Sequence, residues 1–296
     1  MTVITYSALS TFQACPRRYH YQYKLGRVKL QDEIALQVGT AWHRAMEAYW
    51  APGETDRTPA AIEMLRQCAD YLDEAEVAKL LAMVETYHPP VDDFEVVRIE
   101  APFEERIVNP ETGRPMVGTT VAGKIDCLIR RLRDGTMWVL EHKTTASEIL
   151  GYGDYWEALQ IDAQIAIYVV ATGASGAYYD VVRKPTIKLC GKDTDAEAFR
   201  RRCVAQRAEE PASWHQWREV VKSADDVAEA QLDLWQSAHT LSDCERMGRY
   251  PRQSRSCRGL FGRCPYIGVC VGTALIDDDT IFRTKESAHE EWEVKP

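Results

Sequence analysis

The stretch VAGKIDCLIRRLRDGTMWVLEHKT, residues 121–144, decides the fold of this chain of 296 residues. Its two apolar segments have strand-like lengths, and Arg-Asp-Gly at 133–135 between them has the chemistry of a tight turn. Upstream, FEVVRIEAPFEERIV at 94–108 alternates apolar and polar residues and ends in the turn-forming NPETGRP. We therefore predict an antiparallel meander of three strands.

Helices are predicted on both sides of this meander. In TAWHRAMEAYW, residues 40–50, apolar residues recur at helical spacing, and Thr40 after Gly39 can cap the helix. The segment AYYDVVRKPTIKL at 177–189 predicts one more strand. The other helices are expected at Tyr6–Tyr23 (opened by Ser7 or Ser10), Thr58–His88 (stopped by Pro89 and Pro90), Tyr155–Thr172, Asp195–Glu210 and Ala224–Cys244.

The meander carries a pattern of charged residues. Asp126 lies in its second strand, and Glu141-His142-Lys143 closes the third, so that Glu141 and Lys143 share one face of that strand. Two hard carboxylate ligands, with the backbone carbonyl of His142 as a third, suit Mg²⁺ or Mn²⁺. A lysine beside the ion can orient water, help it lose a proton, or stabilise phosphate charge. The alternative is a set of exposed strand charges.

Two helices offer supporting residues. His43 and Glu47 lie four residues apart on one helix face, where His43 is a candidate metal ligand and Glu47 a supporting residue; the alternative for His43 is a structural role. Gln164 and Tyr168 are also four apart, and an inward-facing Gln164 needs a polar partner. A site carboxylate or DNA would serve, although Tyr168 alone could be core.

The net charge of −9 conceals two acid-free segments. Residues 1–31 hold five basic residues and no acid, and residues 246–276 hold six arginines and no acid. Either segment alone predicts a solvated basic face, but together they favour a phosphate-binding surface. Arg17 and Arg18 are the candidate DNA contacts, and the candidate stacking rings are those of Tyr19, Tyr21 and Tyr266.

Nine cysteines, an odd number, argue against a disulfide framework. No apolar run reaches the length of a membrane helix, and the N-terminus lacks the pattern of a secretory signal, so we expect a cytoplasmic protein that does not enter a membrane. Cys15, Cys257, Cys264 and Cys270 lie among glycine, arginine and proline rather than in apolar runs, which argues against the alternative of four ordinary buried thiols. The non-ligand cysteines are expected to be Cys68, Cys127, Cys190, Cys203 and Cys244.

These motifs resemble those of the PD-(D/E)XK nucleases, in particular the RecB-like branch with the AddB nuclease domain and CRISPR-associated adaptation nucleases. The matching pairs are Gly39 with His43, Gly123 with Asp126, Glu141 with Lys143, and Gln164 with Tyr168. The resemblance implies an α/β fold with a restriction-endonuclease-like core, in which helices flank a mixed central sheet. It also implies that His43, Asp126 and Glu141 bind the metal and that Lys143 is catalytic.

The chain is also similar to the iron-sulfur members of that branch, which place one cysteine before the core and three after it. The resemblance implies a 4Fe-4S cluster on Cys15, Cys257, Cys264 and Cys270, clasping residues 1–31 and 246–276 together. A zinc site on the same four thiolates is the alternative. One nuclease domain is expected over residues 1–276, with its core at about 36–190 and an acidic, mobile tail at 277–296.

The expected function is a metal-dependent DNA nuclease, an exonuclease on single-stranded or frayed DNA ends, in phage or bacterial recombination or repair. One alternative is an inactive DNA-binding or assembly subunit that keeps the nuclease fold. Another is a nuclease of CRISPR adaptation.

Overall fold

The computed structural model describes residues 2–30, 34–259, 262–287, 289 and 292. The chain divides into two compact units. The central unit comprises Glu33–Ala101 and Ile125–Ser223, and the terminal unit comprises Met1–Asp32, Pro102–Lys124 and Ala224–Pro296. The single domain expected over residues 1–276 stays a prediction.

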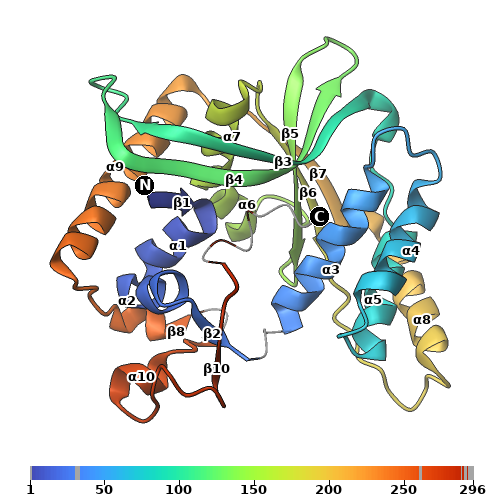
Figure 1. The fold of residues 1–296 in the computed structure, drawn as a ribbon. Helices are drawn as coiled ribbons and strands as arrows, with labels where there is room; N and C mark the ends of the chain where they lie inside the picture. The colour runs from blue at the N-terminus through green and yellow to red at the C-terminus, as the bar shows by residue number, and fades with distance from the viewer. Residues whose placement is uncertain (1, 31–33, 260–261, 288, 290–291, 293–296) are drawn as a thin grey trace. The chain divides into compact units, whose positions relative to one another are not determined.

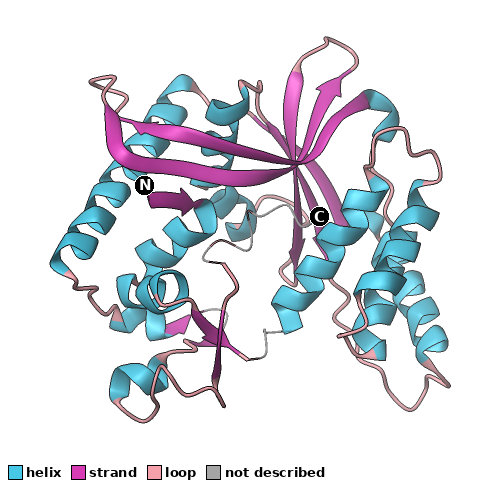
Figure 2. Ribbon diagram, in the orientation of Figure 1, coloured by secondary structure: helices cyan, strands magenta, loops and turns pink. Residues whose placement is uncertain are grey.

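The central unit is built on a mixed sheet (Figures 1 and 2). The strands β3 (Phe94–Val108) and β4 (Pro115–Arg131) pair with each other and run through both units. The end of β4 pairs antiparallel with β5 (Met137–Thr145), which pairs in parallel with β6 (Ala177–Arg183). Antiparallel to β6 lies β7 (His215–Val220), a strand that the sequence analysis missed.

Helices lie against both faces of β5. Its even-numbered residues, Trp138 and Leu140, join a buried cluster with Trp42 and Met46 of α3 (Ile34–Tyr49). Its odd-numbered residues face the other way, where Lys143 bonds to a side chain of α7 (Ala163–Thr172). The expected α/β fold, a mixed central sheet flanked by helices, is therefore confirmed. The remaining helices of this unit are α4 (Arg57–Cys68), α5 (Glu74–Glu85), α6 (Asp154–Gln160) and α8 (Ala196–Glu209), with short 3-10 turns at Val91–Asp93 and Pro211–Ser213.

Two of the predicted long helices are each divided in two. An aspartate begins the second helix of each pair: Asp73 accepts the backbone N–H of Glu76 at 2.8 Å, and Asp162 accepts that of Gln164 at 2.8 Å. Such a side chain satisfies an N–H that has no partner within the helix, which favours a new start over a continuous helix. The helix expected to start at Thr40 begins earlier, at Ile34, and the Thr40 hydroxyl instead donates to the carbonyl of Leu36 at 3.1 Å.

The terminal unit begins with β1 (Thr2–Thr5), which runs parallel to the part of β4 from Thr119 to Ala122. Thr5, rather than Ser7 or Ser10, caps the next helix by accepting the N–H of Ala8 at 3.2 Å. The single helix expected over 6–23 is interrupted at Cys15, because Pro16 has no N–H to continue it. The elements of this unit are α1 (Tyr6–Ala14), α2 (Pro16–Tyr19), a π-helical turn (His20–Lys24), β2 (Arg27–Lys29), α9 (Ala224–Met247), a 3-10 turn (Ser254–Cys257), β8 (Arg258–Gly259), β9 (Gly262–Arg263), α10 (Ile267–Val271) and β10 (Phe282–Thr284).

Part of the predicted mobile tail is held in place. The strand β10 pairs antiparallel with β2, the ring of Phe282 stacks on Tyr266 with centroids 5.6 Å apart, and Asp279 pairs with Arg27 at 2.8 Å. Burial of Phe282 offsets the entropy of ordering this segment, so the expected mobility is wrong here. Residues 1, 31, 260–261, 288, 290–291 and 293–296 of the predicted clasp and tail lie outside the described residues. Among the described residues, no helix is long and apolar enough to span a membrane.

Candidate active site

Glu141 and Lys143 meet on one side of β5 in the central unit. Nζ of Lys143 donates to Oε1 of Glu141 at 2.7 Å, as expected for strand residues two apart. The His142 side chain between them points to the opposite face, where its Nδ1 lies 2.6 Å from Oδ2 of Asp180. The side chain of His142 is thus committed elsewhere, and only its backbone faces the predicted metal site.

Asp126 of β4 links β5 to α3. Its Oδ2 accepts the backbone N–H of His142 at 2.9 Å, and its Oδ1 lies 3.3 Å from Nδ1 of His43. Burial opposes the charged form of His43, but the Asp126 carboxylate and, less strongly, Glu141 raise its pKa to about 9. Burial works against the Asp126 carboxylate in the same way, and His43 holds its pKa below the usual value. The two residues therefore form an ion pair.

Glu141 has an oxygen that the protein leaves unsatisfied. The side chain is 3% exposed, and its Oε2 is buried without a hydrogen-bond partner. Burial, and next the charge of Asp126, raise the pKa of Glu141. A buried acceptor without a partner costs about 1–3 kcal/mol. A divalent cation beside the two acids would give Oε2 a partner and would offset the repulsion between the charges of Glu141 and Asp126. The residues therefore fit the expected metal.

The two carboxylates of the site, Asp126 and Glu141, are each paired with a basic side chain. Within residues 2–30, 34–259, 262–287, 289 and 292, no three side chains of His, Cys, Asp or Glu are already arranged as a metal-binding group. Asp126 is paired with His43, and Glu141 with Lys143. The site thus has the donor types that Mg²⁺ or Mn²⁺ requires, held by protein cations.

Lys143 is fixed from a second side by α7. Its Nζ donates to Oε1 of Gln164 at 2.7 Å, and Nε2 of Gln164 donates to the hydroxyl of Tyr168 at 2.9 Å. The polar partner of Gln164 is therefore the lysine, and not the carboxylate or DNA that the sequence led us to expect. Burial disfavours the ammonium, but Glu141 and then Asp126 raise the pKa of Lys143 overall. A lysine that stays charged can orient a water or stabilise phosphate charge, and is a poor general base.

Behind β5 lies a buried polar network that the sequence analysis missed. Asp180 of β6 has no exposed surface, and its carboxylate contacts His142 at 2.6 Å, the hydroxyl of Tyr87 at 2.6 Å and Nε2 of His215 at 2.7 Å. Trp50 donates to the same hydroxyl at 3.1 Å. The sequence signal was an aspartate inside the apolar run AYYDVV.

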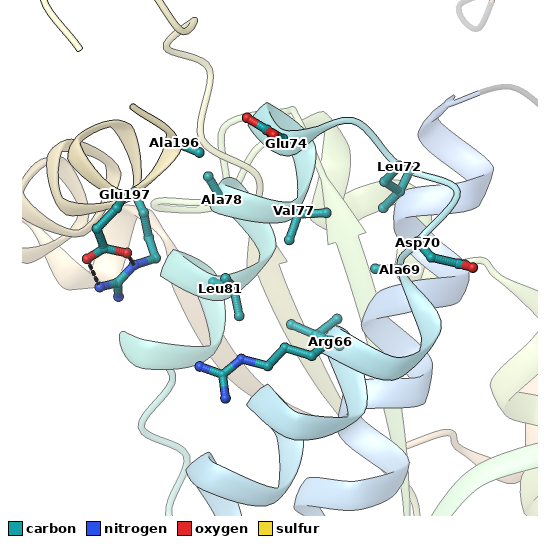
Figure 3. A pocket seen from close by; sticks show the side chains of 12 residues that line it. Arg66, Ala69, Asp70, Leu72, Glu74, Val77, Ala78, Leu81, Ala196 and Glu197 are labelled. Carbon is teal, nitrogen blue, oxygen red and sulfur yellow. Dashed lines mark hydrogen bonds and ion pairs between the residues drawn. The ribbon is translucent and has the colours of Figure 1, made fainter. Parts of the chain in front are cut away.

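Glu47 is paired within its own helix: its carboxylate accepts from Nη1 of Arg44 at 2.9 Å, three residues earlier on α3. The cavity between α4, α5 and α8, about 470 Å³ in volume, is likewise separate (Figure 3). None of the predicted site residues lines it, and its Arg200 is hydrogen-bonded to Glu197 at 2.7 Å.

In the terminal unit, all four cysteines expected to bind iron line one cavity. Cys15, Cys257, Cys264 and Cys270 surround about 380 Å³ together with Arg18. All four are free thiols, and burial raises the pKa of Cys264 and Cys270. The five cysteines predicted to be non-ligands do not line this cavity. A 4Fe-4S cluster needs four thiolates, and these four thiols around one cavity supply that donor set, but among the described residues no three cysteines are arranged as a metal-binding group.

Some of the predicted DNA contacts of the terminal unit are exposed, and others are bonded to or buried in the protein. Nε of Arg17 donates to the carbonyl of Tyr250 at 2.7 Å, and Arg18 lines the cysteine cavity. The expectation that aromatic rings here stack on bases is wrong, because these rings are buried: Tyr19, Tyr21 and Tyr266. The six arginines of residues 246–276 are all exposed, so a basic surface remains.

Three comparisons bear on this architecture. The model of a family described as the PD-(D/E)XK nuclease superfamily matches residues 3–271. None of the curated proteins matches the sequence. A crystal structure from Eubacterium rectale, described as a "putative exonuclease", is similar with a TM-score of 0.50 and 12% identity, covering 92% of this chain and 88% of that one. The crystal structure of SSO0001 has a TM-score of 0.37 and 14% identity, covering 81% of this chain and 76% of that one.

Proposed function

This chain belongs to the PD-(D/E)XK nuclease superfamily, and from that premise we propose that it is a metal-dependent deoxyribonuclease of the RecB-like branch. Membership in this superfamily implies hydrolysis of phosphodiester bonds, with DNA as the substrate. The single observation that carries the metal dependence is the buried Oε2 of Glu141, which lacks a partner beside the second acid, Asp126. Nuclease members of this superfamily generally use Mg²⁺ or Mn²⁺.

We propose Asp126, Glu141, His43 and the backbone carbonyl of His142 as the ligands of that ion. When bound, the ion supplies an activated water and neutralises charge on the phosphate. Lys143, held by Glu141 and Gln164, keeps its positive charge beside the reacting phosphate and orients the water. Tyr168 holds Gln164, which in turn fixes the direction of the lysine. Glu47 supports α3 through Arg44 and takes no part in the chemistry.

For the substrate we propose single-stranded or frayed DNA ends cut exonucleolytically, in the cytoplasm of a bacterium or a phage-infected cell. Recombination or repair is the proposed setting, and CRISPR adaptation the alternative. The similar structure from Eubacterium rectale is described as a "putative exonuclease", which agrees with this proposal. At 12% identity, that similarity shows the fold alone. Arg17, Arg18 and the exposed arginines of residues 246–276 are the proposed phosphate contacts of the terminal unit.

For the terminal unit we propose a structural 4Fe-4S cluster on Cys15, Cys257, Cys264 and Cys270. The shared cavity supports this, because one ligand comes from residues 1–31 and three come from residues 246–276. Loss of the cluster would release these segments from each other. Anaerobically purified protein should show iron-sulfur absorption and contain iron and sulfide, whereas a colourless protein loaded with zinc would establish the zinc alternative.

The nuclease proposal is tested with end-labelled single-stranded DNA and Mn²⁺. Wild-type protein should degrade the DNA, and Lys143→Ala should lower the rate at least about 100-fold without moving the thermal melt by more than a few degrees. Lys192→Ala, which changes an exposed lysine, is the matched control. A wild-type protein that binds DNA but leaves it intact would instead support the inactive DNA-binding or assembly subunit.

A further inference from the structure

Three side chains of the central unit form a stack that ends in an exposed ring. The guanidinium of Arg218 lies 3.9 Å from the ring centroid of Trp156 and 4.7 Å from that of Tyr152. Trp156 is buried, whereas Tyr152 is 84% exposed. Such cation–π contacts contribute to holding the rings in fixed positions. The stack is therefore anchored in the protein at one end and open to solvent at the other.

The loop that carries Tyr152 is fastened to the same arginine. Nη2 of Arg218 donates to the carbonyl of Gly151 at 2.6 Å, and Nε1 of Trp156 donates to the carbonyl of Ile149 at 2.9 Å. Gly151 has φ +77°, a left-handed conformation that a residue with a side chain seldom adopts. The exposed ring is thus held before any ligand arrives, which lowers the entropy that binding would cost.

The strand register places this stack on the catalytic face of the sheet. Glu141 of β5 is the cross-strand partner of Tyr179 in β6, and Tyr179 is the partner of Arg218 in β7. Side chains of directly opposed residues point to the same face, and two strand spacings separate the backbones of Glu141 and Arg218 by about 10 Å. Tyr155, three residues after Tyr152, lies within electrostatic range of Lys143 and Glu141. Arg218, which holds the exposed ring, therefore shares the face of the catalytic carboxylates two strands away from Glu141.

Charge and shape at this position suit one kind of ligand. Among the described residues, the guanidinium of Arg218 donates to the backbone carbonyls of Ile149 and Gly151, and its buried Nη1 has no partner, so no carboxylate neutralises its positive charge. An exposed aromatic ring offers a base a flat apolar surface, and stacking tolerates every base because each has a π face. A base in duplex DNA is already covered on both faces and cannot use such a ring.

We propose that Tyr152, backed by Arg218 and Trp156, is a stacking platform for an unpaired base of the strand being cut. This inference rests on the proposed nuclease function and adds a substrate-binding residue to it: the platform favours DNA whose bases are unstacked near the cleaved bond. Tyr152 binds substrate, while Arg218 and Trp156 are positioning residues that hold its ring.

Binding is measured separately from cleavage, in the Lys143→Ala protein with labelled oligothymidine and with an equally long strand of abasic sites. Adding Tyr152→Ala should weaken binding of oligothymidine between about 5- and 150-fold and leave binding of the abasic strand unchanged. Tyr152→Phe, which keeps the ring, should bind as the parent does. Tyr71→Ala, which removes another exposed tyrosine of the same unit, should also bind as the parent does.

Two results would overturn the platform: unchanged binding of oligothymidine by the Tyr152→Ala protein, or an equal loss on both strands. The proposed function can fail independently of the platform. If wild-type protein with Mn²⁺ leaves DNA intact while Tyr152 still gives base-dependent binding, the stacking site stands and the nuclease proposal falls. If wild-type protein cuts DNA and the Tyr152→Ala change leaves binding of oligothymidine unchanged, the nuclease proposal stands and the stacking site falls.

Discussion

Nδ1 of His142 lies 2.6 Å from Oδ2 of Asp180, on the face of β5 opposite to Glu141 and Lys143. The backbone N–H of the same histidine donates to Asp126 at 2.9 Å. One residue thus connects a buried network behind the strand with the acid of the neighbouring strand. Because the Asp180 carboxylate also holds Tyr87 and His215, the position of β5 is fixed by contacts that never touch the substrate.

Asp180→Asn should therefore impair a site that it does not contact. Asn has no charge and puts an NH2 donor in place of one acceptor oxygen, so at least one of His142, Tyr87 and His215 loses its acceptor, which should lower the free energy of unfolding by about 3 kcal/mol. Looser positioning of β5 should weaken Mn²⁺ binding about 10- to 100-fold. Urea unfolding and Mn²⁺ titration of the folded variant measure the two effects. Asp70→Asn, at an exposed position, is the control, and normal Mn²⁺ affinity in Asp180→Asn would refute the positioning role.

Metal binding should stabilise the protein through Asp126 and Glu141. An ion that binds only the folded state adds about 2.7 kcal/mol at a free concentration 100 times its Kd. We expect Mn²⁺ to raise the thermal midpoint of wild-type protein and to leave that of Asp126→Asn unchanged. Differential scanning calorimetry with and without Mn²⁺ measures this. An equal rise in both proteins would place the stabilising ion elsewhere.

The ion pair between His43 and Asp126 predicts a pH dependence of the metal-free protein. The pKa of His43 is raised from 6.5 to about 9 in the folded state, so the folded state binds its proton more tightly than the unfolded state does. The contribution of this ion pair to the free energy of unfolding is fully present below pH 6.5 and is lost as pH rises through about 9. Because 36% of the His43 side chain is exposed, solvent screening limits the effect to about 1 kcal/mol.

Urea unfolding of the metal-free protein between pH 6 and pH 10 checks this prediction. His43→Gln should flatten the decline across that window, and His88→Gln, at an exposed position, should not. If His43→Gln keeps the wild-type slope, the stability is not linked to this pair.

The cysteine cavity predicts a selective effect of thiol removal. Cys264→Ser should lose iron and visible absorption, and should melt at a lower temperature, because the cluster no longer joins residues 1–31 to residues 246–276. Cys190→Ser changes an exposed cysteine outside the cavity and should keep both iron and thermal midpoint. Iron analysis and absorption spectra of the two variants give the answer. Full iron content in Cys264→Ser would contradict the ligand set.

Local sequence rules predicted the part of the site that lies on one hairpin. The alternation of side chains along β5 put Glu141 and Lys143 together, and four-residue spacing put Gln164 beside Tyr168. Neither rule could pair Gln164 with Lys143, because that contact depends on how α7 packs against the sheet. Asp73 and Asp162 are N-cap residues that mark where the second helix of each pair begins. The apolar periodicity on both sides of each aspartate instead predicted one continuous helix.

Elements defined by distant partners escaped sequence analysis. The four residues of β1 become a strand only against Thr119–Ala122, and β10 only against β2. Asp180 and Tyr152 also gain their roles from residues of other elements: the apolar run around Asp180 marked it as unusual, but its partner His215 lies on β7, as does Arg218, which holds Tyr152. A buried aspartate and an exposed aromatic ring are informative once burial is known, and burial is a property of the whole fold.

The most direct test of the metal site is to measure bound Mn²⁺ and DNA cleavage in the same samples of wild-type protein and Glu141→Gln. Electron paramagnetic resonance measures the ion, and gel analysis of an end-labelled single strand measures cleavage. We predict that wild-type protein binds Mn²⁺ and cuts, and that Glu141→Gln loses both by at least about 100-fold. A Glu141→Gln protein that binds Mn²⁺ and cuts DNA at the wild-type rate would contradict the account.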